Sequence, residues 1–295
     1  MKILTFSLFN TEKSSAKSRG LCLQSEDGDA VLLEENDVKV KRFLIIIPAF
    51  NEAKTIGKVL DKLKGYDVLV VNDASSDNTR NIVESKGFKC ISHKKNKGYC
   101  NALVTGYRYA LEHDYDYVIQ MDADGQHDTC NIEPLKKEIA KDEYDIILGS
   151  RFLKNSNCYK TDFLHMLGYK YFSALVKLLT GITIKDASTG LQALNKKAYS
   201  YCIQHFDAKY PDANFIVHML LHGFRIKELP ATMHERVSGT SMHSGIPVKY
   251  VLYVTRKCLK ERGDVNVCMV KLRRGFRNLS SICIFSKLHS SAPRC

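Results

Sequence analysis

Two aspartates separated by one residue, Asp122 and Asp124, are the first side chains whose types and spacing suggest chemistry. They follow an apolar run over residues 117–121, which predicts a buried strand, and Gln126 lies two residues further on. Ligands of an open parallel sheet bind beyond the carboxyl ends of its strands. Oxygen atoms at that position suit Mg²⁺ or Mn²⁺, often together with substrate phosphates. The pattern predicts metal-assisted departure of a phosphate leaving group, although Asp-Ala-Asp-Gly is also typical of a surface turn.

Carboxylates also follow the earlier predicted strands. An apolar run over residues 43–47 precedes Glu52, and a run over residues 67–72 precedes Asp73 and Asp77. Carboxylates accept hydrogen bonds from a base imide and from ribose hydroxyls, and they hold cations that neutralise a pyrophosphate. The acidic strand ends therefore predict a nucleotide site. The alternative is that each carboxylate only caps a helix or a turn, which suits Asp77 best.

Strands and helices are predicted to alternate around these side chains. Apolar runs predict five strands, at 43–47, 67–72, 88–92, 117–121 and 144–148. Three helices are predicted between them, at 53–64, in the segment that ends at 85, and at 101–113. This alternation indicates an α/β fold with a parallel sheet and right-handed crossovers. The sequence has no Gly-x-Gly-x-x-Gly segment after the first strand and no Gly-x-x-x-x-Gly-Lys-Ser/Thr segment. The first absence counts against a dinucleotide-binding dehydrogenase, and the second counts against a P-loop NTPase.

Composition narrows the class of protein and its partners. The net charge of +12 suits an anionic partner such as a nucleotide, a nucleic acid or an acidic lipid. Ten cysteines without a Cys-x-x-Cys pair argue against a zinc module and indicate reduced thiols. The sequence shows neither a signal peptide nor an apolar run long enough to span a membrane. We therefore expect a cytoplasmic protein that is soluble or lies on the cytoplasmic face of a membrane.

The residue composition of the sequence changes near residue 42 and again near residue 263. Residues 1–41 mix Ser, Lys and acidic residues and predict a weakly ordered N-terminal extension. Residues 263–295 form a short basic tail, to which no motif assigns a role. Residues 42–262 lie between them and carry all the strand-end carboxylates, so we expect the functional domain there.

Four motifs occur in order, at Ile46–Glu52, Val71–Thr79, Asn96–Leu103 and Asp122–His127. Together they resemble the family 2 glycosyltransferases of GT-A fold, particularly the dolichol-phosphate mannosyltransferase-like branch and its bacterial polyprenyl-phosphate relatives. The resemblance covers residues 42–241. It implies a Rossmann-like, mostly parallel sheet with helices on both faces, plus C-terminal helical and loop additions. It also implies a metal-dependent, inverting hexosyltransferase with a UDP- or GDP-linked donor. The acceptor would be a polyprenyl phosphate or a glycan precursor in cell-surface polysaccharide or glycolipid synthesis.

The resemblance also gives roles to single residues. Those implied to bind the nucleotide and its sugar are Pro48, Ala49, Glu52, Asp73, Asp122 and Arg236. Those implied to bind Mg²⁺ or Mn²⁺ are Asp122, Asp124 and Gln126. Arg236 lies in Arg236–Ser241, a segment that looks like the loop closing over the donor pyrophosphate, and Arg151 looks like the contact to an acceptor phosphate. A guanidinium suits both tasks because its planar fork of donors matches a phosphate, although either Arg could be an ordinary surface cation.

Three positions depart from the family pattern. Cys100 replaces the usual Gly before a helix, and Leu191 replaces the Phe that ends the Asp-x-x-Ser/Thr-Gly-Phe segment at Asp186–Leu191. Met242 and His243 stand where a Lys often follows the closing loop. The last change weakens the expectation of a strongly phosphate-binding acceptor site.

A general base is needed only for some acceptors. A lipid phosphate is already anionic, whereas a sugar hydroxyl must lose its proton to a nearby carboxylate. The candidate base is Asp212, which lies just before an apolar helix predicted at 215–221. The candidate catalytic residues are therefore Asp124 and Asp212. The slightly favoured alternative for Asp212 is a helix N-cap.

Two basic amphipathic segments bear on membrane contact. Residues 163–179 place Leu164, Leu167, Tyr171, Leu175 and Leu178 on one helical face. Residues 248–260 repeat the pattern with Tyr250, Val251, Val254 and Cys258 beside several Lys and Arg residues. Such helices can lie on anionic lipid, but ordinary core packing is the more common explanation.

Two other functions compete with glycosyl transfer. A sugar nucleotidyltransferase also uses an α/β nucleotide fold, but no Gly-rich basic phosphate loop lies near the first strand. A basic nucleic-acid-binding α/β module would explain the charge of +12. Nucleic-acid readers gather Lys, Arg and aromatic residues, however, whereas the strand ends here are acidic, so we expect nucleic acid not to be the partner.

Overall fold

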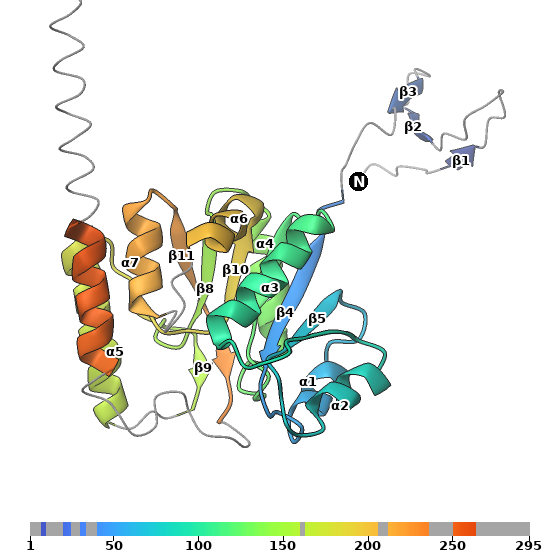
Figure 1. Cartoon of the computed structure of the whole chain (residues 1–295). Coiled ribbons are helices and arrows are strands. Elements are labelled where there is room, and N and C mark those ends of the chain that lie inside the picture. The colour runs from blue at the N-terminus through green and yellow to red at the C-terminus, as the bar shows by residue number, and fades with distance from the viewer. Residues whose placement is uncertain are drawn as a thin grey trace, which may run out of the picture. The chain divides into compact units, whose positions relative to one another are not determined.

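The computed structural model describes residues 7–9, 20–24, 30–33, 40–159, 163–205, 212–235 and 250–263 (Figure 1). The chain divides into two compact units, Met1–Lys41 and Arg42–Cys295. The first unit contains a three-stranded antiparallel sheet made of β1 (Ser7–Phe9), β2 (Gly20–Gln24) and β3 (Ala30–Leu33). All the predicted nucleotide and metal residues belong to the second unit.

The second unit is built on a seven-stranded sheet with the order β11-β8-β10-β7-β4-β5-β6. Its strands are β4 (Phe43–Ala49), β5 (Val68–Asn72), β6 (Lys89–Ser92), β7 (Tyr117–Gln120), β8 (Ile146–Ser150), β10 (Gln192–Asn195) and β11 (Ile226–Pro230). β10 runs antiparallel to both of its neighbours, and the other pairings are parallel. The mostly parallel α/β sheet expected from the sequence is therefore confirmed.

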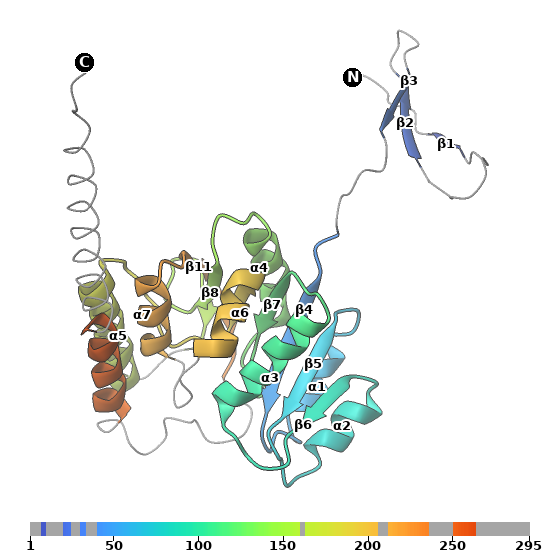
Figure 2. The same cartoon turned by 45° about the horizontal axis from the view of Figure 1, so that its top comes forward.

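Helices cover both faces of this sheet because its central strands are apolar on both sides. In β4, Leu44 and Ile46 join one buried cluster, whereas Ile45 and Ile47 join the other. The first cluster is completed by α3 (Tyr99–Glu112), α5 (Phe163–Thr180), α6 (Lys196–His205), α7 (Ala213–Leu221) and a helix at 250–263. The second is completed by α1 (Ile56–Asp61), α2 (Thr79–Ser85) and α4 (Ile132–Ile139). Figure 2 shows α3 and α6 in front of the sheet.

Several boundaries differ from those that the sequence predicts. Helix α3 begins at Tyr99 rather than at 101, because Gly98 has a φ of 88° and turns the chain sharply just before it. Helix α1 is shorter than the predicted 53–64, since residues 53–55 form turns. A 3₁₀ turn at Thr129–Asn131 and the short strands β9 (Asn157–Cys158) and β12 (Thr232–Met233) complete the described elements. Among the described residues, no helix has the length and apolar character needed to cross a bilayer.

Candidate active site

The loops after β4 and β5 are fastened to each other. Asn51 and Ala74 both have positive φ angles, 57° and 60°, so each loop turns sharply as its strand ends. The side-chain oxygen of Asn51 accepts a hydrogen bond from the amide of Ser76 at 2.8 Å. Asp77 accepts one from the amide of Ala53 at 3.0 Å, and so joins the two loops as a structural residue. Pro48 and Ala49, the last two residues of β4, lead directly into this junction.

Two of the predicted nucleotide contacts have internal partners at this junction. Glu52 accepts a hydrogen bond from the Thr55 hydroxyl at 2.8 Å. Asp73 is buried, and it accepts hydrogen bonds from the amides of Lys97 and Gly98 at 2.9 and 2.7 Å. A ring nitrogen of His93 lies 2.6 Å from the same carboxylate. Asp73 therefore fixes the loop that enters α3, whatever it contributes to a ligand.

Asp122 stands at the centre of the strand-end region. Its carboxylate accepts a hydrogen bond from the Tyr99 hydroxyl at 2.9 Å and lies 3.1 Å from the Nε2 atom of His127. Desolvation, together with the charge of Asp122, raises the pKa of Tyr99 well above its ordinary value, so this hydroxyl stays protonated and donates. The Asp122 side chain keeps 30% of its surface exposed, which leaves it accessible to a ligand.

Gly190 brings a distant segment against Asp122. A Cβ atom at position 190 would lie 2.5 Å from the Oδ2 atom of Asp122, closer than real Cβ contacts come. Only glycine therefore lets the Asp186–Leu191 segment approach the carboxylate so closely. The segment that the sequence pattern singled out thus forms one wall of the candidate site.

Asp124 and Gln126 belong to the tight turn that follows. Gly125 has a φ of 79°, and the buried Asp124 carboxylate accepts a hydrogen bond from the Gln126 amide at 2.9 Å. The Gln126 carbonyl accepts from the amide of His234 at 2.8 Å, and His127 forms a β-bridge with Met233. The turn is thereby tied to β12, near the start of the predicted closing loop. Arg236 and that loop lie outside the described residues.

These donors fit a divalent cation that also takes oxygen atoms from its substrate. Within the described part of the chain, no three His, Cys, Asp or Glu side chains come together in a way that could hold a metal ion. Two carboxylates are enough for magnesium when phosphates and water supply the remaining ligands. The hydrogen bond from Tyr99 orients the Asp122 carboxylate for such a role, and the missing side chain of Gly190 leaves room for it.

Arg151 is engaged within the protein. It forms a bidentate pair with Asp186, in which its Nη2 and Nε atoms each donate to a carboxylate oxygen at 2.7 Å, and its Nη1 atom donates to the Tyr169 hydroxyl at 3.2 Å. Asp186 is fully buried. Burial lowers the pKa of Arg151, but the pair with Asp186 outweighs this effect and keeps that pKa above its ordinary value. Asp186 thus balances the charge of Arg151, and the role of Arg151 toward an acceptor phosphate stays a prediction.

Asp212 occupies the N-cap position of α7, but its side chain makes no capping hydrogen bond. The buried carboxylate instead accepts a hydrogen bond from the Tyr250 hydroxyl at 2.6 Å. The favoured cap interpretation is therefore wrong for the side chain, because the helix at 250–263 brings in a donor from far along the chain. Burial, followed by the charge of Asp212, raises the pKa of Tyr250, so this hydroxyl remains a donor.

Sequence reasoning missed the roles of four residues: Tyr99, His127, Gly190 and Tyr250. The first three lie within the quoted segments, but their relation to Asp122 depends on the folding of three distant loops. For Tyr250 the sequence predicts only a place on an amphipathic helical face. No spacing in the sequence connects it with Asp212.

Comparisons with known proteins agree with this architecture. The family model described as Glycosyl transferase family 2 matches residues 44–202. An undecaprenyl-phosphate mannosyltransferase of Micrococcus luteus is 30% identical, over 76% of this chain and 96% of the relative. A UDP-N-acetylglucosamine–dolichyl-phosphate N-acetylglucosaminyltransferase of Methanococcus voltae is 28% identical, over 73% and 96%. The same fold is found in glucosyl-3-phosphoglycerate synthase of Mycobacterium tuberculosis, which was solved with Mn²⁺, UDP-glucose and phosphoglyceric acid. The TM-score is 0.52, and the sequences are 15% identical over 76% of this chain and 80% of that one.

Proposed function

The chain belongs to glycosyl transferase family 2 and is a glycosyltransferase, and from that premise we propose that it transfers a sugar from a nucleoside-diphosphate sugar to a polyprenyl phosphate. The acceptor class is supported by the names of its relatives, which act on undecaprenyl and dolichyl phosphates. Residues 42–262 would form the catalytic domain. We expect the enzyme to work where its lipid acceptor is found, on a membrane surface.

The observation that carries the proposal is the position of Asp122 and Asp124 beyond the end of β7. Asp122 is braced by Tyr99 and His127 and is partly exposed, next to the wall formed by Gly190. A divalent cation bound there would neutralise the charge that develops on the departing diphosphate. The residues present fit Mg²⁺ or Mn²⁺, and glucosyl-3-phosphoglycerate synthase, which has this fold, has been solved with either ion.

The residues around this position divide the remaining work. Pro48, Ala49 and Glu52 lie where β4 ends and would contact the base and ribose, while Asp73 holds the loop before α3. Arg236 would clamp the diphosphate and exclude water. The reaction would invert the anomeric centre, because an oxygen of the acceptor attacks the carbon opposite its bond to the diphosphate as that bond breaks.

A polyprenyl phosphate needs no general base, since its oxygen is already ionised. Asp212 is buried and bonded to Tyr250, an arrangement that supports a structural task when the acceptor is a phosphate. If the acceptor were a hydroxyl, Asp212 would be the candidate base. The variant Asp212→Asn distinguishes the two cases, because only a base loses most of its turnover when its carboxylate becomes an amide.

A donor screen tests the proposal directly. Purified protein is incubated with undecaprenyl phosphate, Mn²⁺ and UDP-glucose, UDP-N-acetylglucosamine or GDP-mannose in turn, and the release of UDP or GDP and the glycolipid are measured. We expect one donor to give product of inverted anomeric configuration, and we expect Asp122→Asn to abolish it. The exposed Asp114→Asn serves as a matched control. Absence of release with every donor, or equal activity of Asp122→Asn, would refute the proposal.

A further inference from the structure

Exposed apolar side chains gather on one part of the molecule. Of the nine large apolar side chains exposed among the described residues, six come from α5, the residues just after it and helix 250–263: Leu167, Tyr171, Leu178, Ile182, Leu252 and Leu259. Leu178 is 72% exposed and Leu252 is 58% exposed. Apolar side chains scattered singly over a surface need no explanation, but a contiguous group of them marks an interaction site.

The two helices lie side by side and run in the same direction. The Tyr171 hydroxyl lies 2.8 Å from the Thr255 hydroxyl, and seven residues further on in each helix Arg262 donates to the Leu178 carbonyl at 2.7 Å. Figures 1 and 2 both show helix 250–263, in orange-red, beside α5. Leu252 and Leu259 are spaced three and four residues from Thr255, so they lie on the same side of their helix as this contact line. The exposed apolar side chains of the two helices, Leu167, Tyr171, Leu178, Leu252 and Leu259, therefore form one ridge along the line where the helices meet, which we call the α5 ridge.

Core packing does not account for the α5 ridge. The buried side of α5 consists of Phe172, Leu175, Val176 and Leu179, all in the first hydrophobic cluster. Leu164 of the predicted stripe lies outside the side chains that the structure describes; of the other four, Leu175 is buried, while Leu167, Tyr171 and Leu178 face outward. For helix 250–263 the core interpretation holds, because Val254 and Cys258 are fully buried. Its exposed large apolar side chains are Leu252 and Leu259, which the sequence pattern did not single out.

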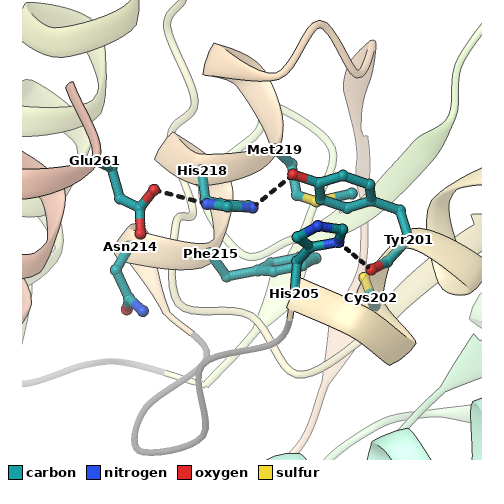
Figure 3. A pocket seen from close by; sticks show the side chains of 8 residues that line it. All are labelled: Tyr201, Cys202, His205, Asn214, Phe215, His218, Met219 and Glu261. Atoms are coloured by element: carbon teal, nitrogen blue, oxygen red, sulfur yellow. Dashed lines mark hydrogen bonds and ion pairs between the residues drawn. The ribbon is translucent and has the colours of Figure 1, made fainter. Parts of the chain in front are cut away.

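Helix 250–263 is fastened to the body of the domain at both ends. Tyr250 donates to Asp212 at 2.6 Å near its beginning. Near its end, Glu261 lies 2.7 Å from one ring nitrogen of His218, whose other ring nitrogen lies 3.1 Å from the Tyr201 hydroxyl (Figure 3). These three side chains line a small pocket of about 30 Å³ between α6, α7 and the helix. The helix that carries Leu252 and Leu259 is therefore anchored to α7 at both of its ends.

The charge beside the α5 ridge is almost entirely positive. α5 carries Lys170 and Lys177 and no acidic residue, and helix 250–263 carries four basic residues. The only carboxylate of the two helices, Glu261, points to His218. Lys170 and Lys177, with Lys185, also line a hollow of about 330 Å³, whose other walls include Phe152, Met166 and Tyr169. No ion pair with a carboxylate is found for these three ammonium groups within the described residues.

We propose that the α5 ridge docks on the surface of a lipid bilayer that contains anionic lipids, with the lysines of the adjoining hollow meeting the lipid headgroups. Large apolar side chains flanked by Lys and Arg are typical of helices that lie in the membrane interface. A protein partner would have to be strongly acidic to match this charge, and a nucleic acid would gain nothing from the exposed leucines. Docking goes beyond the transfer reaction, since it does not depend on the sugar or the donor.

The test measures co-flotation of the full chain with vesicles, either of phosphatidylcholine alone or of phosphatidylcholine mixed with phosphatidylglycerol. We expect binding to the mixed vesicles and little binding to the neutral ones. The variant L178Q/L259Q should lose most binding, and K170Q/K177Q should bind about 25-fold more weakly, since each basic residue contributes about 1 kcal/mol, or roughly a factor of five. The matched controls are L111Q, an exposed leucine on α3, and K62Q/K64Q beyond α1.

Several outcomes would overturn the proposal. One is the absence of binding to mixed vesicles, and another is equal binding by the wild type and L178Q/L259Q. A third is that the wild type does not bind vesicles but forms a dimer in solution, and that L178Q/L259Q is a monomer. Thermal unfolding of each variant shows whether it is folded. Release of UDP or GDP with a short water-soluble prenyl phosphate, measured without vesicles, should be unchanged in these variants. That readout separates a failure of docking from a failure of the proposed transfer reaction.

Discussion

Gly190→Ala should impair transfer by displacing Asp122. The added Cβ atom would lie 2.5 Å from the Oδ2 atom of Asp122, whereas ordinary contacts begin near 3.4 Å. The carboxylate or the Gly190 backbone must therefore shift by roughly 1 Å, and a misplacement of that size in a catalytic group costs about 100-fold in rate. The hydrogen bond from Tyr99, now 2.9 Å long, would lengthen or break with the shift.

The assay is the release of UDP or GDP at saturating acceptor, with Mn²⁺ varied. We expect turnover to fall about 100-fold and the Mn²⁺ requirement to rise, because the carboxylate no longer sits where a cation would meet it. Gly168→Ala on α5 serves as the neutral control, since no atom lies within 4 Å of the new Cβ. Gly149→Ala controls for packing strain, because its Cβ meets Leu191 at 2.6 Å instead of a carboxylate.

The reasoning would be refuted if Gly190→Ala were folded and kept turnover within about twofold of the wild type. It would also be refuted if Gly149→Ala lost activity in the same way at equal stability. In that case general strain in the Asp186–Leu191 segment, rather than the position of Asp122, would control the rate.

Three further predictions concern the supports of the site. Asp186→Asn leaves the buried Arg151 without its counter-charge, so denaturant unfolding should show a loss of about 3–5 kcal/mol, much of it recovered in R151M/D186L. Tyr250→Phe should lower the free energy of unfolding by about 1.5–3 kcal/mol, because Asp212 loses a charge-assisted hydrogen bond; an unchanged value would contradict this role. Hydrogen bonds from a backbone amide and a histidine lower the pKa of Asp128 to about 2, below its ordinary value of 3.8. Its contribution, about 1 kcal/mol after solvent screening, should be present above about pH 4 and disappear as the pH falls toward 2, measured as the stability difference from Asp128→Asn.

The fold was predictable because its central strands are apolar on both faces and alternate with helices. That pattern fixes a parallel sheet, and the motifs fix which loops lie beyond its strand ends. The antiparallel strand β10 was not predicted, because a short buried run such as Gln192–Asn195 carries no signal for its direction. Its place between β7 and β8 is decided by packing across distant segments.

The candidate site was predictable in its residue types and less so in its contacts. Sequence placed Asp73 and Asp122 at strand ends, but it could not show that Asp73 holds the loop before α3. Asp212 does hold the N-cap position that the sequence favours, because a position before a helix is local information, but the partner of its side chain, Tyr250, comes from another helix and could not be predicted. The outward stripe of α5 looked like core because periodicity gives a face without saying what covers it.

The most direct test of the central claim is the affinity for the nucleoside diphosphate of the preferred donor, measured by calorimetry with and without Mn²⁺. If Asp122 and Asp124 hold a cation against the diphosphate, Mn²⁺ should tighten binding to the wild type by about tenfold or more, and D122N/D124N should lose that gain. Equal tightening by Mn²⁺ in the wild type and in a folded D122N/D124N protein would contradict the account.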